Sequence, residues 1–107
     1  MITVYKYEIS PLDVGNKTYV ELPEFAKILC VGTQSVLVKT GTVVHPDERL
    51  FLWALVNSNS PKTRRELLVL GTGHEVINEV NMNKYRYIGT AFFKQNILVY
   101  HVWELIA

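Results

Sequence analysis

The spacing of strand-forming runs most constrains what this chain can fold into. Short segments rich in Val, Ile, Thr, Tyr and Trp alternate along the whole sequence with clusters of Gly, Pro, Asn, Asp and Ser. The segments favour strands and the clusters favour turns. Because 107 residues build a single hydrophobic core, the pattern predicts one β-rich domain over residues 1–107, a small antiparallel sandwich or barrel of six to seven strands.

The runs also place the individual strands. We expect the first two, residues 2–9 and 17–22, to pair as a hairpin with a long loop. The last two, residues 85–93 and 97–105, should form a hairpin across Lys94-Gln95-Asn96. Between these pairs, strands are expected at 27–34, at 50–56 and from Arg64 to the glycines at 71 and 73.

Two segments of the middle of the chain have distinct expectations. Residues 50–56, Leu-Phe-Leu-Trp-Ala-Leu-Val, lack polar alternation, so this strand should be central, with both faces covered by this subunit or by a neighbouring one. Residues 35–49 contain two short β-type runs on either side of Lys39-Thr40-Gly41. They are interpreted as a hairpin or loop insertion that projects from the domain.

Composition bounds the partners of the protein. Apolar residues make up 49% of the chain and charged residues 20%, and the mean hydropathy is positive. A monomer this small can hardly bury so much apolar surface, so a homo-oligomer is expected. Eleven basic residues oppose ten acidic ones, and this balance gives no global field that would draw the protein onto a nucleic-acid polymer or an anionic membrane.

The compartment is predicted from cysteine usage and hydropathy. The single cysteine, Cys30, lies in an apolar run, where we expect it to be buried, and it can form no disulfide within the chain. No basic and then apolar leader precedes the first strand, and no apolar run approaches the ~20 residues that span a bilayer. These features favour a soluble, intracellular protein.

Catalytic and metal chemistry find little support in the residues. No serine or cysteine stands in the context of an activated nucleophile. The three histidines, His45, His74 and His101, have no i, i+2 or i, i+4 partner among themselves. His101 and Glu104 are three residues apart, so a strand would send them to opposite faces. We therefore expect no enzyme activity, no metal and no cofactor.

The segment Gly71-Thr72-Gly73-His74 is the best candidate for a binding site. Two glycines around a small hydroxyl let backbone N–H groups approach a ligand, although a strand that ends in an ordinary turn has the same composition. Aromatic side chains could stack on a base, although strand aromatics also belong to cores. Arginines could bind phosphate, although they also form solvated surface. A second Gly-Thr element could add a hydroxyl, although its glycine also fits a bulge. The full candidate set is Trp53, Arg64, Arg65, Gly71, Thr72, Gly73, His74, Tyr87 and Thr90. Strand alternation places Arg64 and Arg65 on different faces.

Several blocks of the sequence occur in a specific order between Tyr5 and Glu104. They are Pro23, residues 26–31, Gln34 and residues 52–56, 71–74, 87–90 and 98–104. Together they resemble a family of small, mostly uncharacterised bacteriophage proteins. The chain departs from that pattern at Phe25, where a glycine is expected, and over residues 35–49, which are longer than usual.

The resemblance implies a phage origin and expression in the cytoplasm of an infected bacterium. Small oligomeric β-rich phage proteins without catalytic residues are often counter-defence factors, including sponges that trap nucleotide immune signals. The leading hypothesis is therefore a non-catalytic binding protein that sequesters a small nucleotide. Two alternatives remain open: an inhibitor that docks a strand edge or the hairpin of residues 36–44 onto a host enzyme, and a minor virion or assembly component.

Overall fold

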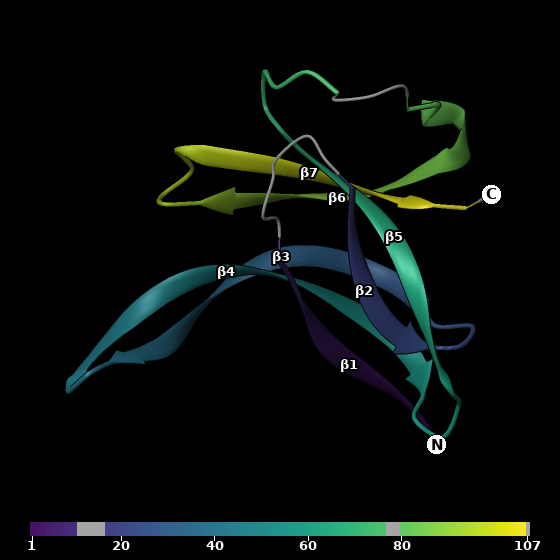
Figure 1. The fold of residues 1–107 in the computed structure, drawn as a ribbon, viewed down its shortest axis with the longest axis horizontal. Coiled ribbons are helices and arrows are strands. Elements are labelled where there is room, and N and C mark those ends of the chain that lie inside the picture. The colour runs from purple at the N-terminus through teal and green to yellow at the C-terminus, as the bar shows by residue number, and fades with distance from the viewer. Residues whose placement is uncertain (11–16, 77–79, 107) are drawn as a thin grey trace.

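Two antiparallel sheets account for nearly all the regular structure (Figure 1). The computed structural model describes residues 1–10, 17–76 and 80–106. One sheet has three strands in the order β1-β4-β3, and the other has four in the order β2-β5-β7-β6. The seven strands confirm the predicted all-β class. Their bounds are β1 Ile2–Ile9, β2 Lys17–Pro23, β3 Lys27–Thr40, β4 Val43–Asn57, β5 Lys62–Gly71, β6 Tyr85–Phe93 and β7 Leu98–Leu105.

The core lies between the two sheets. Because side chains alternate along a strand, β4 directs every second residue toward the opposite sheet. These inner side chains are almost fully buried and pack against those of β5 and β7. The largest fully buried side chains of this core are Leu22, Leu50, Leu52, Val56, Leu67, Val69 and Val102.

The sheets approach each other along the edges formed by β3 and β6. Thr33 Oγ1 of β3 donates a hydrogen bond to the carbonyl oxygen of Phe92 in β6, at 2.9 Å. A Cβ atom on Gly89 would lie only 3.1 Å from Cγ2 of Val31. Gly89 therefore permits a contact that a larger residue would push apart.

The expected hairpin of the first two strands is wrong. β1 pairs with β4, from Ile2 opposite Asn57 to Ile9 opposite Leu50, whereas β2 pairs with β5 in the other sheet. β1 and β2 therefore belong to different sheets. Residues 11–16 of the expected loop lie outside the described residues.

The expected burial of Cys30 is also wrong. A β-bulge between Ile28 and Cys30 inserts one extra residue into β3. Simple alternation would send residue 30 to the same side as the buried Ile28, but the bulge turns it outward, opposite Trp53. The thiol is consequently exposed.

β4 has the central position that its sequence predicted. It lies between β1 and β3 in the three-stranded sheet. Its inner face is buried, but its outer face is only partly covered, since Phe51 is buried while Leu55 is 40% exposed. The continuous apolar sequence thus correctly indicated the place of the strand, and cover of its outer face by a neighbouring subunit stays a prediction.

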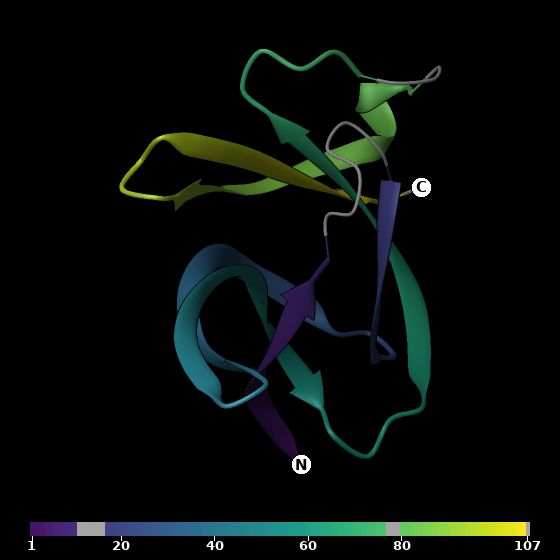
Figure 2. The ribbon, with the colours of Figure 1, turned by 60° about the vertical axis from the view of Figure 1, so that its left-hand side comes forward.

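Residues 35–49 extend the β3–β4 hairpin. The ladder continues without a break from Ser35 opposite Glu48 to Thr40 opposite Val43, so β3 is longer than the expected 27–34 strand. Figure 2 shows this distal part curling away from the other strands. Leu37, 78% exposed, and Val43, 61% exposed, lie on it.

Two turns have left-handed backbone without glycine. Phe25 has φ 65° in the turn that Ala26 N closes by donating to Pro23 O, and its side chain is 89% exposed. The family resemblance led us to expect a glycine at this position. The positive φ explains the preference, because glycine adopts left-handed backbone without steric cost. Gln95 and Asn96 also have positive φ, in the turn of the predicted β6–β7 hairpin.

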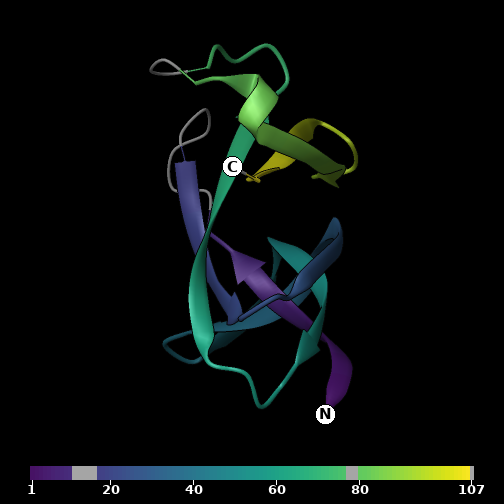
Figure 3. The same ribbon diagram turned by 90° about the vertical axis from the view of Figure 1, so that its right-hand side faces the viewer.

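β5 connects the site described below to the rest of the molecule. Figure 3 shows it running from beside the three-stranded sheet up to the β6–β7 hairpin. Among the described residues between β5 and β6 is one 3-10 turn, η1, Met82–Lys84. In the described ranges, no helix is long and apolar enough to cross a bilayer.

Candidate ligand-binding site

A row of hydrogen-bonding side chains lies on the outer face of β6 and β7. His101 of β7 stands opposite Thr90 of β6, and its neighbours Tyr100 and Val102 point into the core. Its Nε2 lies 2.9 Å from Thr72 Oγ1, and its Nδ1 lies 3.0 Å from Thr90 Oγ1. The Thr90 hydroxyl also hydrogen-bonds to the Tyr87 hydroxyl. We call these four residues the His101 row.

A bulge in β6 brings two members of the row together. Tyr87 and Thr90 are three residues apart, which would place them on opposite faces of a regular strand. The register shifts between Tyr87 and Gly89, so the extra residue, Ile88, restores both side chains to the outer face. The bulge that the sequence indicated near Gly89 therefore helps to build the row.

Aromatic side chains border the row. Trp103 follows His101 by two residues on the same face and stands opposite Tyr87. The Tyr87 and Trp103 rings meet edge to face, with centroids 5.4 Å apart, and the His101 ring lies 6.3 Å from that of Trp103. Tyr87 is 52% exposed. The face thus offers an aromatic surface directly beside hydroxyl and imidazole groups.

The Gly71–His74 turn lines a pocket next to the row. The turn closes with a hydrogen bond from His74 N to Gly71 O at 3.0 Å, and Gly73 has φ +83°. The pocket has a volume of about 330 Å³ and is lined by Gly71, Thr72, His74, Ile97, Leu98, Val99 and Tyr100. Thr72 belongs to both features, since its hydroxyl bonds to His101. The pocket and the row together form the candidate site.

The structure brings six of the nine predicted site residues to this region and leaves three elsewhere. The six are Gly71, Thr72, Gly73, His74, Tyr87 and Thr90. Trp53 lies on the outer face of the other sheet, opposite Cys30. The Arg64 guanidinium lies over the Tyr19 ring, 3.9 Å from its centroid.

Arg65 is held by an internal ion pair. It points inward, as the predicted alternation with Arg64 requires, and its Nη2 lies 2.5 Å from Oε2 of Glu104. Glu104 is 2% exposed and is also paired with Arg86. Arg65 Nη1 donates to the Ala26 carbonyl oxygen at 2.9 Å. A guanidinium with these partners serves the fold, so we assign neither arginine to the candidate site.

Two residues of the site were missing from the predicted set. His101 was considered only as a metal ligand, and Trp103 only as one of several strand aromatics. Their i, i+2 spacing in the last strand, His-Val-Trp, does indicate a shared face. Which face it is depends on the packing of Val102, and the hydroxyl partners depend on the sheet register.

The described residues of the site include no carboxylate, lysine or arginine. Neither the lining of the pocket nor the His101 row contains an Asp, Glu, Lys or Arg among them. Ligand recognition here depends on hydroxyl, imidazole and backbone groups together with aromatic contact.

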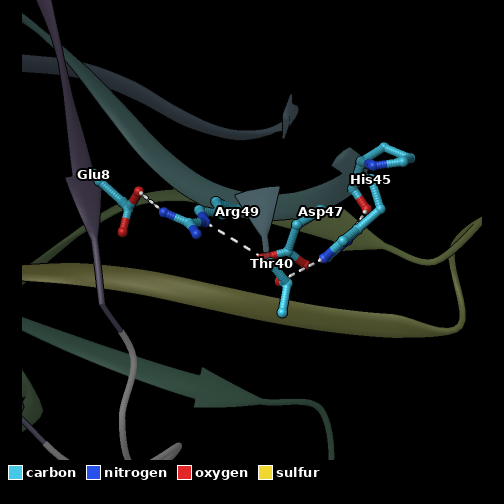
Figure 4. Close-up of polar contacts among 6 residues, drawn as sticks. Glu8, Thr40, His45, Asp47 and Arg49 are labelled. Carbon is cyan, nitrogen blue, oxygen red and sulfur yellow. Dashed lines mark hydrogen bonds and ion pairs between the residues drawn. The ribbon is translucent and has the colours of Figure 1, made fainter. Parts of the chain in front are cut away.

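A second polar cluster lies on the β3–β4 hairpin and differs in character (Figure 4). Arg49 bridges Glu8, at 3.2 Å, and Asp47, at 3.4 Å. The hydrogen bond to Glu8, followed by that to Asp47, raises the pKa of Arg49 above its usual value. Further along the hairpin, His45 Nε2 lies 3.2 Å from Thr40 Oγ1. The cation of this cluster is already neutralised by two carboxylates, which leaves it poorly suited to an anionic ligand.

Metal ligands do not gather in the described residues, where no three His, Cys, Asp or Glu side chains come together. The fold and the site thus define a small β-sandwich with a neutral, aromatic and hydroxyl-rich outer face. The model of a family described as a domain of unknown function (DUF7352) matches residues 1–107, and the chain belongs to that family. No curated protein and no solved structure matches the chain.

Proposed function

We propose that this protein is a non-catalytic binding protein that sequesters a small molecule containing a nucleoside. The observation that carries the proposal is the His101 row beside the Gly71–His74 pocket. In it, an exposed tyrosine and a tryptophan adjoin groups that both donate and accept hydrogen bonds.

The chemistry of a nucleoside fits these groups. A nucleobase gains ~1–3 kcal/mol by stacking on an aromatic side chain, and Tyr87 presents half of its surface to solvent beside Trp103. Hydroxyls such as those of Thr72 and Thr90 match the donors and acceptors of a ribose or of a base edge. The neutral site suits this part of a nucleotide better than its phosphates.

The surroundings of His101 favour binding over turnover. Both ring nitrogens lie within hydrogen-bonding distance of threonine hydroxyls. A general base is normally oriented by a carboxylate that stabilises the imidazolium, and Glu104, the nearest acid along β7, points to the opposite face. This arrangement supports a role for the imidazole in holding a ligand.

The biological setting of the proposal comes from the sequence resemblance. A phage protein that acts by sequestration in the cytoplasm of an infected bacterium would trap a nucleotide signal of host immunity. Cyclic dinucleotides and isomers of ADP-ribose are therefore the ligands to test first.

Thermal unfolding with a panel of these nucleotides tests the proposal. A ligand at 100 times its dissociation constant adds ~2.7 kcal/mol to the free energy of unfolding. We expect His101→Gln to weaken binding at least tenfold, which corresponds to the loss of ~1.4 kcal/mol. His45→Gln is the matched control, because His45 also bonds to a threonine hydroxyl but lies on the distal hairpin. The proposal fails if no nucleotide raises the melting temperature, or if both variants bind like the wild type.

A second candidate function is supported by the distal hairpin. Leu37, Val43 and Val44 are 78%, 61% and 57% exposed on a two-stranded ribbon. Such a ribbon can bind a host protein by adding strands or filling a groove. A pull-down from host lysate that recovers one protein in stoichiometric amount, and loses it with Leu37→Lys, would favour an inhibitor over a sponge. The remaining alternative, a virion component, predicts that the protein is found in purified particles.

A further inference from the structure

A pocket with two lysines lies on the same outer face as the His101 row. It has a volume of about 300 Å³ and is lined by Lys17, Glu66, Val80, Asn81, Lys84, Tyr85 and Leu105. The residues come from β2, β5, β6, β7, η1 and the two residues before η1, so the pocket joins parts of the chain that are distant in sequence. We call it the lysine pocket.

Glu66, the one carboxylate among the described residues that line this pocket, is already partnered. Glu66 accepts hydrogen bonds from the hydroxyls of Tyr85 and Tyr19, and its Oε2 lies 3.8 Å from Lys17 Nζ. Burial, followed by the hydrogen bond to Glu66, raises the pKa of Tyr85 to about 12. The phenol, which is protonated at neutral pH even at its ordinary pKa, thus continues to donate to the carboxylate at more alkaline pH.

Two lysines and one carboxylate are among the described residues that line the pocket. Lys84, at the end of η1, forms no ion pair within the described part of the chain. Lys17 is 45% exposed in its side chain and holds Glu66 only at long range. Among the described residues, the lysine pocket therefore has an excess of positive charge, whereas the His101 row has no lysine or arginine.

The register of the sheet fixes the path between the two sites. Lys17 pairs with Leu68, Leu68 with Trp103, and Trp103 with Tyr87, so the aromatic pair lies in the same cross-strand row as Lys17. Along β7, His101 and Leu105 are four residues apart, or ~13 Å at the rise of a strand. Tyr87 and Trp103 are two residues from Tyr85 and Leu105, respectively, which line the lysine pocket. A nucleoside stacked there lies at the end of the His101 row nearest to the lysine pocket and can extend its phosphates toward the lysines.

We propose that the lysine pocket binds the phosphate groups of the ligand whose nucleoside part occupies the His101 row. This inference rests on the proposed function and identifies Lys17 and Lys84, in place of Arg64 and Arg65, as the phosphate-binding cations. The ligand class is thereby narrowed to nucleotides that carry a diphosphate or an equivalent pair of phosphates.

Isothermal titration with adenosine, ADP-ribose and inorganic pyrophosphate tests the assignment. We expect ADP-ribose to bind at least tenfold more tightly than adenosine. Lys84→Gln should weaken the binding of ADP-ribose at least fivefold and leave the affinity for adenosine unchanged. Lys17→Gln should act in the same direction, and added salt should weaken ADP-ribose less in the variants than in the wild type. Lys62→Gln, an exposed lysine at the start of β5, is the matched control.

The outcomes separate this inference from the function on which it rests. Equal affinities for adenosine and ADP-ribose, or equal effects of Lys84→Gln and Lys62→Gln, contradict phosphate binding in the lysine pocket. Neither result contradicts nucleoside binding at the His101 row. Pyrophosphate binding that Lys84→Gln abolishes, with no adenosine binding, supports the lysine pocket and contradicts the nucleoside site. Absence of binding for all three probes overturns both.

Discussion

At the scale of single residues, two adjacent arginines have unrelated roles. Arg64 lies over the Tyr19 ring on the outer face, while Arg65 reaches inward to a carboxylate that is 2% exposed. A buried carboxylate is stable only when its charge is paired, because the interior solvates it poorly. Glu104 therefore depends on Arg65, whereas nothing in the core depends on Arg64.

Replacement of each arginine by leucine tests this difference. Arg65→Leu should lower the free energy of unfolding by about 3 kcal/mol, since it leaves Glu104 with Arg86 alone. Arg64→Leu removes an exposed cation–π contact and should cost less than about 1 kcal/mol. Chemical denaturation of the two variants gives both values. Equal stabilities would contradict a structural role for the Arg65 pair.

At the scale of elements, two bulges decide which side chains share a face. The bulge in β3 turns Cys30 outward, and the bulge in β6 aligns Tyr87 with Thr90. Each inserts one residue, and a shift of one residue exchanges the two faces of a strand. The β6 bulge also lies beside Gly89, where β3 comes closest. The candidate site and the junction of the sheets therefore depend on the same irregularity.

The contact at Gly89 gives a prediction for this junction. Gly89→Ala places a methyl group 3.1 Å from Val31 Cγ2 and should destabilise the protein by ~1–2 kcal/mol through overpacking. In a Val31→Ala background the methyl group has room, so the same substitution should cost at least ~1 kcal/mol less. A double-mutant cycle by denaturation measures this coupling. Additive effects would show that the close approach of β3 and β6 does not restrict the size of the side chain at residue 89.

At the scale of the whole molecule, the outer face of the three-stranded sheet remains uncovered in the single chain. Strand alternation places Ile2, Val4 and Leu55 together on that face, with exposures of 72%, 48% and 40%. The bulged Leu29 is 46% exposed. Apolar side chains gathered in this way are typical of an interface. The composition predicts self-association, and these side chains indicate the face at which we expect it to occur.

We expect the protein to self-associate through this face. Size-exclusion chromatography with light scattering at micromolar concentration should give a mass above the 12.3 kDa of one chain. Leu55→Lys should shift the mass toward that of one chain, because it buries a charge in the interface. Leu37→Lys, on the distal hairpin, is the matched control and should not. A wild-type protein of single-chain mass would contradict the prediction.

Part of the candidate site could be predicted from sequence because it is local. The Gly71–His74 turn follows from its glycines, and Gly73 does have the left-handed backbone that glycine favours. The assembly of the His101 row could not be predicted, since it joins β5, β6 and β7 through register. Arg65 was chosen for phosphate from its type alone, and its partner Glu104 lies 39 residues away in sequence.

The sequence by itself determined the class of fold, most strand positions and the central place of β4, because strand propensity and side-chain alternation are properties of short segments. Only the tertiary structure decided that β1 and β2 belong to different sheets, that Cys30 is exposed and that His101 meets two threonines. These features depend on which strands pair and where a bulge shifts their register. Such choices are made by the packing of the whole core, and no single segment contains them.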